Sequence, residues 1–178
     1  DFIKIQRPSV SIPQLPVKGC IPYTISPMPV INSIDGIASY EWDFGDGNIS
    51  TQQNPTHTYT VQGTYTVRLI ITSNSGCRDT LTIPAAVKVG TKPVANFIAG
   101  PIPQCAFQPV TFTDQTTSTP PVDEWQWIFG DGGTSTQQNP SYTYSSPGTF
   151  DVTLIATNNG CPDTIVQTQY VKILPPVA

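Results

Sequence analysis

The sequence predicts an all-β protein that contains two similar β-sandwich repeats in tandem. Three observations lead to this prediction: an internal repeat, short segments in which apolar and polar side chains alternate, and turn residues between those segments. Alternation with a period of two indicates strands with one buried face, and clusters of Gly, Asn and Asp mark the turns that separate them.

The internal repeat has an offset of 85 residues, from Trp42 to Trp127. The segment 40–47, YEWDFGDG, recurs at 125–132 as WQWIFGDG, and STQQNP recurs unchanged at the same offset. Self-similarity at a fixed offset indicates that the chain contains two copies of one structural unit. We expect one repeat at 8–90 and a second at 93–174.

The ends of the chain resemble pieces of further repeats. The segment 87–89, VKV, matches VKI at 171–173 and also IKI at 3–5. We therefore expect residues 1–7 to be the end of a preceding repeat and residues 175–178 to be a linker or the start of a following repeat.

Aromatic side chains mark the predicted core of each repeat. In the first repeat Trp42 and Phe44 alternate with acidic residues, which is typical of a strand with one buried face. The same face recurs in the second repeat, and further aromatic residues begin the later strands. The predicted core signature is Trp42, Phe44, Tyr59, Tyr65, Trp127, Phe129, Tyr144 and Phe150.

Two tight turns are predicted at equivalent positions of the repeats. Gly and Asp tolerate the positive φ angles that hairpin turns require. The turn residues are Gly45, Asp46 and Gly47 in the first repeat and Gly130, Asp131 and Gly132 in the second. Strands separated by turns at this spacing predict two stacked sheets of the immunoglobulin-like type.

Tyr59 and Tyr144 each lie four residues before a glycine. This position is similar to that of a tyrosine corner, in which the hydroxyl group bonds nearby backbone. An ordinary core tyrosine is the alternative.

These motifs resemble those of the PKD (polycystic kidney disease) domain. The resemblance rests on WDFGDG at 42–47, NPTHTY at 54–59 and GTYTV at 63–67, with related residues in the second repeat. Ile128 and Pro27 depart from the family pattern. The resemblance implies seven-stranded sandwiches, found mainly on extracellular proteins. The placement of the cysteines is also similar to repeats of giant type IX-secreted surface adhesins of gliding bacteria, which implies a role in cell adhesion or gliding motility.

Composition and charge argue against several classes of function. The formal net charge is −4 and no cluster of Lys or Arg occurs, so we expect no nucleic-acid partner. No apolar run approaches the roughly 20 residues needed to span a bilayer, so we expect no direct membrane insertion.

Four cysteines allow three disulfide connectivities. Each repeat contributes one early and one late cysteine, and this predicts the pairs Cys20–Cys77 and Cys105–Cys161. Disulfides form in oxidising compartments, so the pairing would place the protein outside the cell, at the cell surface. Four reduced, buried thiols are the alternative.

The sequence offers little for catalysis, and we expect a non-catalytic protein without a cofactor. Its one histidine, His57, is matched by Tyr142 in the second repeat, so no histidine-based site recurs. Asp43, Asp46 and Asn48 could supply oxygen ligands to calcium, which needs six to eight of them. The alternative is that the turn aspartates bond backbone amides.

Thr80 and Thr164 each follow an aspartate and precede an apolar residue. This pattern resembles the O-glycosylation sequence of the bacterial group just named. The alternative is a turn aspartate that leads into the last strand, where Thr is favoured.

The leading functional prediction is a structural repeat of a large cell-surface protein, which forms a semi-rigid stalk or filament and displays an adhesin. Its partners would be neighbouring PKD repeats of the same chain, and the short proline-containing linkers favour stiffness. Direct binding of a surface glycan or protein is one alternative. An accessory module of a secreted hydrolase is another.

Overall fold

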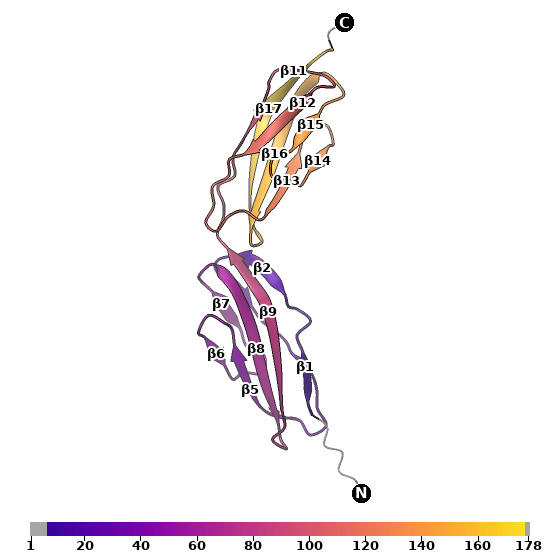
Figure 1. Cartoon of the computed structure of the whole chain (residues 1–178). Helices are drawn as coiled ribbons and strands as arrows, with labels where there is room; N and C mark the ends of the chain where they lie inside the picture. The colour runs from indigo at the N-terminus through magenta and orange to yellow at the C-terminus, as the bar shows by residue number, and fades with distance from the viewer. Residues whose placement is uncertain (1–6, 177–178) are drawn as a thin grey trace. The chain divides into compact units, whose positions relative to one another are not determined.

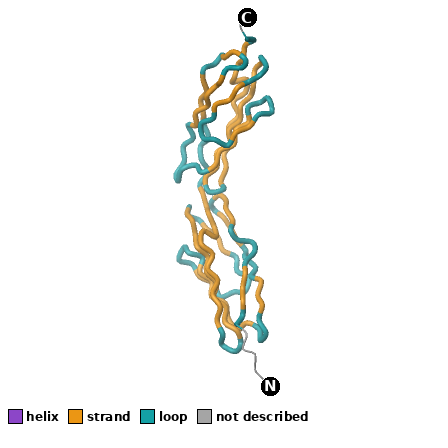
Figure 2. Tube along the Cα trace, turned by 45° about the vertical axis from the view of Figure 1, so that its right-hand side comes forward, coloured by secondary structure: helices purple, strands orange, loops and turns teal. Residues whose placement is uncertain are grey.

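A computed structural model describes residues 7–176 and divides the chain into two compact units, one that ends at Gly90 and one that begins at Thr91 (Figure 1). We call them repeat 1 and repeat 2. Within the described residues the secondary structure is entirely β, and no helix is present, so none could cross a membrane (Figure 2). The predicted all-β class with two immunoglobulin-like domains in tandem is confirmed.

Repeat 1 contains one five-stranded sheet and two shorter strand pairs. The five-stranded sheet has the order β2 (Val17–Cys20), β9 (Arg78–Gly90), β8 (Gly63–Ser73), β5 (Ile37–Asp43) and β6 (Ile49–Ser50). The shorter pairs are β1 (Ser9–Ser11) with β4 (Val30–Asn32), and β3 (Tyr23–Ile25) with β7 (His57–Tyr59).

Repeat 2 has the same plan with a continuous second sheet. Its five-stranded sheet has the order β11 (Gln104–Cys105), β17 (Cys161–Leu174), β16 (Gly148–Asn158), β13 (Glu124–Ile128) and β14 (Thr134–Ser135). The three-stranded sheet has the order β10 (Phe97–Gly100), β12 (Pro109–Asp114) and β15 (Ser141–Thr143).

The described residues therefore form nine strands in repeat 1 and eight in repeat 2, where the family resemblance implied seven in each. Prolines account for one difference between the repeats. In repeat 2 the amide of Phe112 donates to the carbonyl of Pro140 at 2.8 Å, and Phe112 lies inside β12. The matching residue of repeat 1 is Pro27, which has no amide hydrogen, so β3 and β4 are separate strands there.

Each repeat has its own core between its sheets. Trp42, Phe44 and Leu69 are at most 1% exposed in repeat 1, and the alternating side chains of β5 and β8 place them there. Their counterparts Trp127 and Phe129 are fully buried in repeat 2. The two cores are separate clusters, so each repeat buries apolar surface of its own.

The predicted hairpin turns occur where expected. Gly45 and Gly47 both have positive φ angles, as do Gly130 and Gly132. A hydrogen bond from the amide of Phe44 to the carbonyl of Asn48, 3.1 Å long, joins the two ends of the turn in repeat 1. Gly45 packs against the carbonyl of Thr66 so closely that a β-carbon would collide with it.

The predicted pair Cys20–Cys77 is wrong because the two residues lie at opposite ends of repeat 1. Cys20 ends β2, which runs parallel to β9 and places Cys20 beside Gly90 at the end of that strand. Cys77 precedes the first residue of β9. A strand of 13 residues separates the two ends by about 40 Å, and a disulfide needs Cα atoms within about 7 Å.

The predicted pair Cys105–Cys161 is wrong for the same reason. Cys105 pairs in parallel with Leu174 at the end of β17, and Cys161 is the first of the 14 residues of that strand. Accordingly, Cys77 and Cys105 are free thiols, while Cys20 and Cys161 are disulfide-bonded. The parallel pairing of β2 with β9 and of β11 with β17 places the early and the late cysteine at opposite ends of each repeat.

The predicted repeat bounds of 8–90 and 93–174 stay predictions. The proposed remnants of neighbouring repeats at 1–7 and 175–178 lie largely outside the described residues.

Candidate functional site

The hairpin turn of each repeat holds an aspartate that contacts a ring from the strand opposite. In repeat 1 the Asp46 carboxylate lies 2.8 Å from Nε2 of His57 and accepts hydrogen bonds from both the amide and the side chain of Asn48. The imidazole stacks on Phe44, with ring centroids 4.2 Å apart. The aspartate thus joins the turn to β7.

Repeat 2 makes the same connection with a different ring. The hydroxyl of Tyr142 donates to the Asp131 carboxylate at 2.9 Å, and the phenol ring stacks on Phe129 with centroids 3.9 Å apart. The amide of Gly133 also donates a hydrogen bond to the Asp131 carboxylate, at 3.0 Å. Because His57 and Tyr142 occupy matching positions, the shared element is a planar ring with a polar edge directed at the turn aspartate.

Sequence reasoning missed this pairing. The signal was present, because His57 follows Asp46 by 11 residues and Tyr142 follows Asp131 by the same interval. The replacement of His57 by Tyr142 argues against a shared catalytic role, but it is compatible with a shared hydrogen bond to the turn aspartate. As hydrogen-bonding partners of a carboxylate the two side chains are equivalent.

The environment of Asp46 shifts its acidity. Burial raises its pKa, but hydrogen bonds from Asn48 and His57 stabilise the carboxylate more strongly, and the net effect lowers the pKa below its ordinary value. The carboxylate is therefore ionised in the folded protein at neutral pH.

The candidate calcium ligands Asp43, Asp46 and Asn48 bind other groups. Asp43 accepts from the amide of Gly45 at 3.0 Å and from the Arg68 guanidinium at 3.2 Å. One oxygen of Asp46 accepts from the backbone amide of Asn48, as the alternative interpretation of this turn predicted, and the other contacts the side chains of Asn48 and His57. No group of three or more metal-binding side chains occurs among residues 7–176.

The tryptophan and tyrosine signature residues direct their polar atoms to backbone carbonyls. Nε1 of Trp42 donates to Gln52 at 2.9 Å, and the Tyr59 hydroxyl donates to Phe44 at 3.0 Å. Repeat 2 reproduces both bonds at 2.8 and 3.0 Å, from Trp127 to Gln137 and from Tyr144 to Phe129. Tyr59 and Tyr144 thus bond a backbone carbonyl at the start of the hairpin turn, 15 residues before them, whereas a tyrosine corner bonds backbone only a few residues away.

Tyr65 and Phe150 complete the signature as partly buried rings that stack on these tyrosines. Their centroids lie 4.4 Å from Tyr59 and 4.5 Å from Tyr144, respectively. Tyr65 also donates to the carbonyl of Val61, four residues before it, at 2.7 Å.

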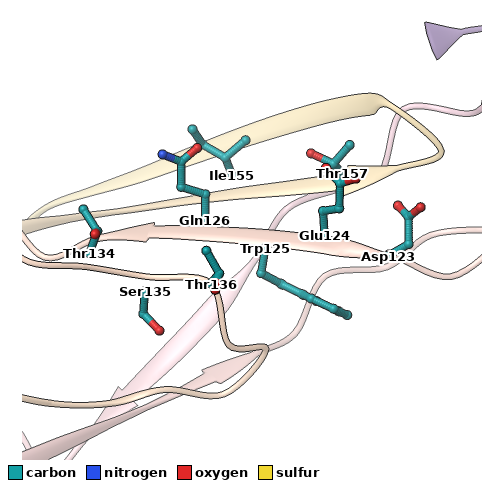
Figure 3. A pocket seen from close by; sticks show the side chains of 9 residues that line it. All are labelled: Asp123, Glu124, Trp125, Gln126, Thr134, Ser135, Thr136, Ile155 and Thr157. Atoms are coloured by element: carbon teal, nitrogen blue, oxygen red, sulfur yellow. The ribbon is translucent and has the colours of Figure 1, made fainter. Parts of the chain in front are cut away.

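Repeat 2 carries an open groove of about 540 Å³ on the outer face of its five-stranded sheet (Figure 3). The side chains of Gln126 and Ile155 face it, whereas the indole of Trp125 points to the other side of β13. That indole packs against the core and donates to Asp114 at 2.7 Å. The groove therefore offers polar and aliphatic groups but no aromatic platform.

Thr80 and Thr164 are exposed residues of β9 and β17. Their hydroxyl groups are accessible to a modifying enzyme, and their glycosylation stays a prediction. The preceding Asp163 is bound internally, because it accepts from the amide of Ala95 at 2.9 Å and pairs with Lys92 at 3.1 Å.

Solved structures with the same fold include the fibronectin(III)-like modules of CbhA from Clostridium thermocellum. They match 94% of this chain and 95% of that one, with a TM-score of 0.56 and 17% identity. Murine CEACAM1b matches 93% of this chain and 100% of its own, with a TM-score of 0.56 and 12% identity. The PKD1 domain of the Vibrio cholerae metalloprotease PrtV matches 46% of this chain and 98% of its own, with 30% identity and a TM-score of 0.40.

Curated relatives match over short stretches. Collagenase ColA of Bacillus cereus is 52% identical over 40 residues, which is 22% of this chain and 4% of that protein. The metalloprotease PrtV of Vibrio cholerae is 47% identical over 49 residues, 28% of this chain and 5% of its own length. The matched stretches are thus a small part of each relative.

A family model described as the PKD domain matches residues 30–89 and again residues 90–173. These two matches cover most of the chain. The first begins at β4 of repeat 1, the second covers the strands of repeat 2, and both include the hairpin aspartate and the buried tryptophan of their repeat. The chain belongs to the PKD domain family.

Proposed function

We propose that this chain is a non-catalytic structural segment of a larger extracellular protein, in which successive PKD repeats form a semi-rigid stalk. One observation carries the proposal: the polar atoms of the signature residues are used inside each repeat. Trp42, Tyr59 and Asp46 all bond the hairpin or its neighbours, and their counterparts in repeat 2 do the same. These polar atoms stabilise each module, so among residues 7–176 the signature residues do not direct them toward a common point where a substrate could bind.

The short connection between the repeats supports stiffness. Repeat 1 ends with β9 at Gly90, and Val94 already bridges to Thr117 in repeat 2, so three residues connect them. Two of the three are bound to repeat 2: the Thr91 hydroxyl donates to the carbonyl of Thr119 at 2.7 Å, and Lys92 pairs with Asp163 at 3.1 Å. The third is proline, which has restricted backbone freedom.

The partners of the chain in this proposal are neighbouring PKD repeats, and no nucleic acid or membrane contact is required. A giant type IX-secreted adhesin of a gliding bacterium is the fuller form of the proposal. It rests on the similarity of the cysteine placement to such repeats. A disulfide suits an oxidising, extracellular location.

Small-angle X-ray scattering tests the stalk. Linked copies of the 178-residue chain, with two, four and six repeats, should grow in maximum dimension in proportion to the number of repeats. We expect about 35–40 Å for each repeat, from strands that rise about 3.3 Å per residue plus their loops. Growth close to the square root of the number of repeats, as for a flexible chain, would contradict the proposal.

An accessory module of a hydrolase is the second candidate, because the curated relatives include collagenases and a metalloprotease. Co-sedimentation of the chain with fibrillar collagen tests the simplest form of this idea. Saturable binding would favour the accessory module over the stalk, and a collagenase segment of matched length provides the positive control.

Direct adhesion is the third candidate, and the groove beside Gln126 is the feature that favours it. A glycan microarray probed with the chain tests it. Binding that is lost in Gln126→Ala would assign adhesion to the groove. Binding that survives this substitution would place the adhesive surface elsewhere.

A further inference from the structure

β13 of repeat 2 has a strand partner along only part of one of its edges. On one side it pairs with β16 over its whole length. On the other side it pairs with β14 only at Trp127 and Ile128. Past β14 the chain leaves this line, since the carbonyl of Gln137 accepts a hydrogen bond from the indole of the buried Trp127 at 2.8 Å. Among the residues that the structure describes, 124–126 thus have no strand partner on this side, and we call them the free edge.

The open groove of repeat 2 lies along the free edge (Figure 3). One side of it is formed by residues 123–126 and the other by residues 134–136, so it continues the line of β14 beside β13. Its volume of about 540 Å³ is in the range of ligand sites, roughly 300–1,000 Å³. The backbone amides and carbonyls of an unpaired edge are a template for a further strand.

The matching edge in repeat 1 is protected by charged side chains. β6 likewise pairs with only the last two residues of β5. There, however, Arg78 donates to Glu41 at 2.9 Å, and Arg68 donates to Asp43 at 3.2 Å. The groove beside β5 has a volume of only about 140 Å³. Charged side chains of this kind keep other strands away from an edge.

Repeat 2 has lost this protection. The four charged residues are replaced at the matching positions by Gln126, Ile128, Thr153 and Pro162. A second difference lies in the backbone, because the register of β5 shifts between Ile37 and Ser39, whereas that of β13 is continuous. A register irregularity twists an edge away from further pairing, and β13 has none. The free edge of repeat 2 is therefore regular and open.

Charge and side-chain chemistry indicate what the groove accepts. Asp123 and Glu124 are exposed at one end of it, and none of the described residues that line it is Lys, Arg or His. A second copy of the same edge would bring further carboxylates to this end without a cation, which is unfavourable. A sugar would find no aromatic ring to stack on, because the indole of Trp125 points away. An extended peptide with a basic residue fits both the backbone and the charge.

We propose that the free edge of repeat 2 binds an extended, basic peptide segment of another protein by strand addition. The segment continues the line of β14, its main chain pairs with residues 124–126, and a Lys or Arg side chain lies beside Asp123 and Glu124. The proposal gives the direct-adhesion candidate a ligand class. It does not depend on the stalk, which the scattering of linked copies judges separately.

A displayed library of random nine-residue peptides, sorted for binding to the 178-residue chain, tests the proposal. We expect the enriched peptides to contain Lys or Arg and to be rich in β-branched residues, which favour strands. NMR of the ¹⁵N-labelled chain with the strongest synthetic peptide should show shifted amide signals at 124–126 and 134–136. A library that yields no binder, or binders that shift only amides elsewhere, would overturn the proposal.

Backbone methylation of the selected peptide separates strand addition from binding by side chains. Successive amides of a strand point to opposite edges, so two peptides are made, with N-methyl groups at the odd or at the even positions. Only the pattern that blocks the amides facing β13 should abolish binding, by at least about tenfold in affinity, and the other should bind more tightly. Equal affinities of both methylated peptides and the parent would refute strand addition.

An exchange of residues between the repeats provides the matched protein variant. Gln126→Glu with Pro162→Arg gives repeat 2 the ion pair that Glu41 and Arg78 form in repeat 1, and it should weaken peptide binding at least about tenfold. Thr113→Arg adds an arginine to the exposed side of the three-stranded sheet and should leave binding unchanged. Equal affinities of the two variants would overturn the proposal, as would a glycan that binds the groove when no peptide does.

Discussion

The hydroxyl of Tyr59 donates a 3.0 Å hydrogen bond to the carbonyl oxygen of Phe44, in a position where neither residue is more than 1% exposed. Tyr144 and Phe129 repeat this bond in the second sandwich. In repeat 1 the bond links β7, which pairs with β3, to the residue that follows β5 in the five-stranded sheet, at the start of the acidic turn.

Removing this hydroxyl should destabilise the repeat that contains it. Tyr59→Phe and Tyr144→Phe should each lower the free energy of unfolding by about 1–3 kcal/mol, because a buried carbonyl loses its partner. Urea denaturation followed by tryptophan fluorescence measures the change.

Tyr40→Phe provides the control, since the structure shows no hydrogen bond from that hydroxyl within the described residues, and we expect a change below about 0.5 kcal/mol. Equal effects of the Tyr40 and Tyr59 substitutions would contradict the role of the buried bond.

Alkaline pH should unfold the protein through the same tyrosines. Burial raises the pKa of the Tyr59 and Tyr144 hydroxyls far above the ordinary value of 10.0. A group whose pKa is raised on folding stabilises the folded state fully below its unfolded pKa. That stabilisation is lost as the pH rises through the folded pKa, so stability should decline above about pH 10.

Thermal unfolding measured by circular dichroism between pH 8 and pH 12 should show this decline, given that free tyrosine titrates near pH 10. The double substitution Tyr59→Phe with Tyr144→Phe should make the alkaline limb shallower. An unchanged limb would show that other groups cause the alkaline loss.

Acid should weaken the hairpin of repeat 1. The pKa of Asp46 lies below its ordinary value of 3.8, so its contribution is complete above that value and is lost as the pH falls through the folded pKa. Carboxyl chemical shifts recorded by NMR as a function of pH measure this titration directly. A midpoint above 3.8 for Asp46 would contradict the stabilising contacts seen in the structure.

Exchange of the two hairpin rings should be tolerated. His57→Tyr gives repeat 1 the ring of repeat 2, and the new hydroxyl can donate to Asp46, so we expect a change within about 0.5 kcal/mol. His57→Phe keeps the stacking on Phe44 but removes the hydrogen bond, and it should cost about 1 kcal/mol. Urea midpoints of the two variants compare them, and a phenylalanine variant as stable as the tyrosine variant would refute the bond's contribution.

Gly45 should tolerate substitution less well than Gly47. Both have positive φ angles, so alanine costs about 1–2 kcal/mol of backbone strain at either position. Only at Gly45 would the new β-carbon also strike the carbonyl of Thr66, whereas nothing lies within 4 Å at Gly47. Gly45→Ala should therefore cost at least about 1 kcal/mol more than Gly47→Ala, measured by urea denaturation. Equal costs would show that the turn relaxes away from the carbonyl.

The sequence by itself determined the two-repeat organisation, the strand class and the hairpin turns. These features follow from local rules: alternation places Trp42 and Phe44 on one face, and Gly45 and Gly47 supply the positive φ angles that the turn needs. Because the same motifs recur 85 residues later, the same strands and turns are predicted in the second repeat.

The tertiary structure decided which distant residues meet. The partner of Asp46 was hidden because a hydrogen-bonding role can be filled by either histidine or tyrosine. The cysteine pairs could not be predicted because β2 and β11 run parallel to the last strands of their repeats. The direction of β2 or β11 decides at which end of the repeat its cysteine lies. Residue order along the chain leaves that direction open, because it is fixed by pairing between segments about 70 residues apart.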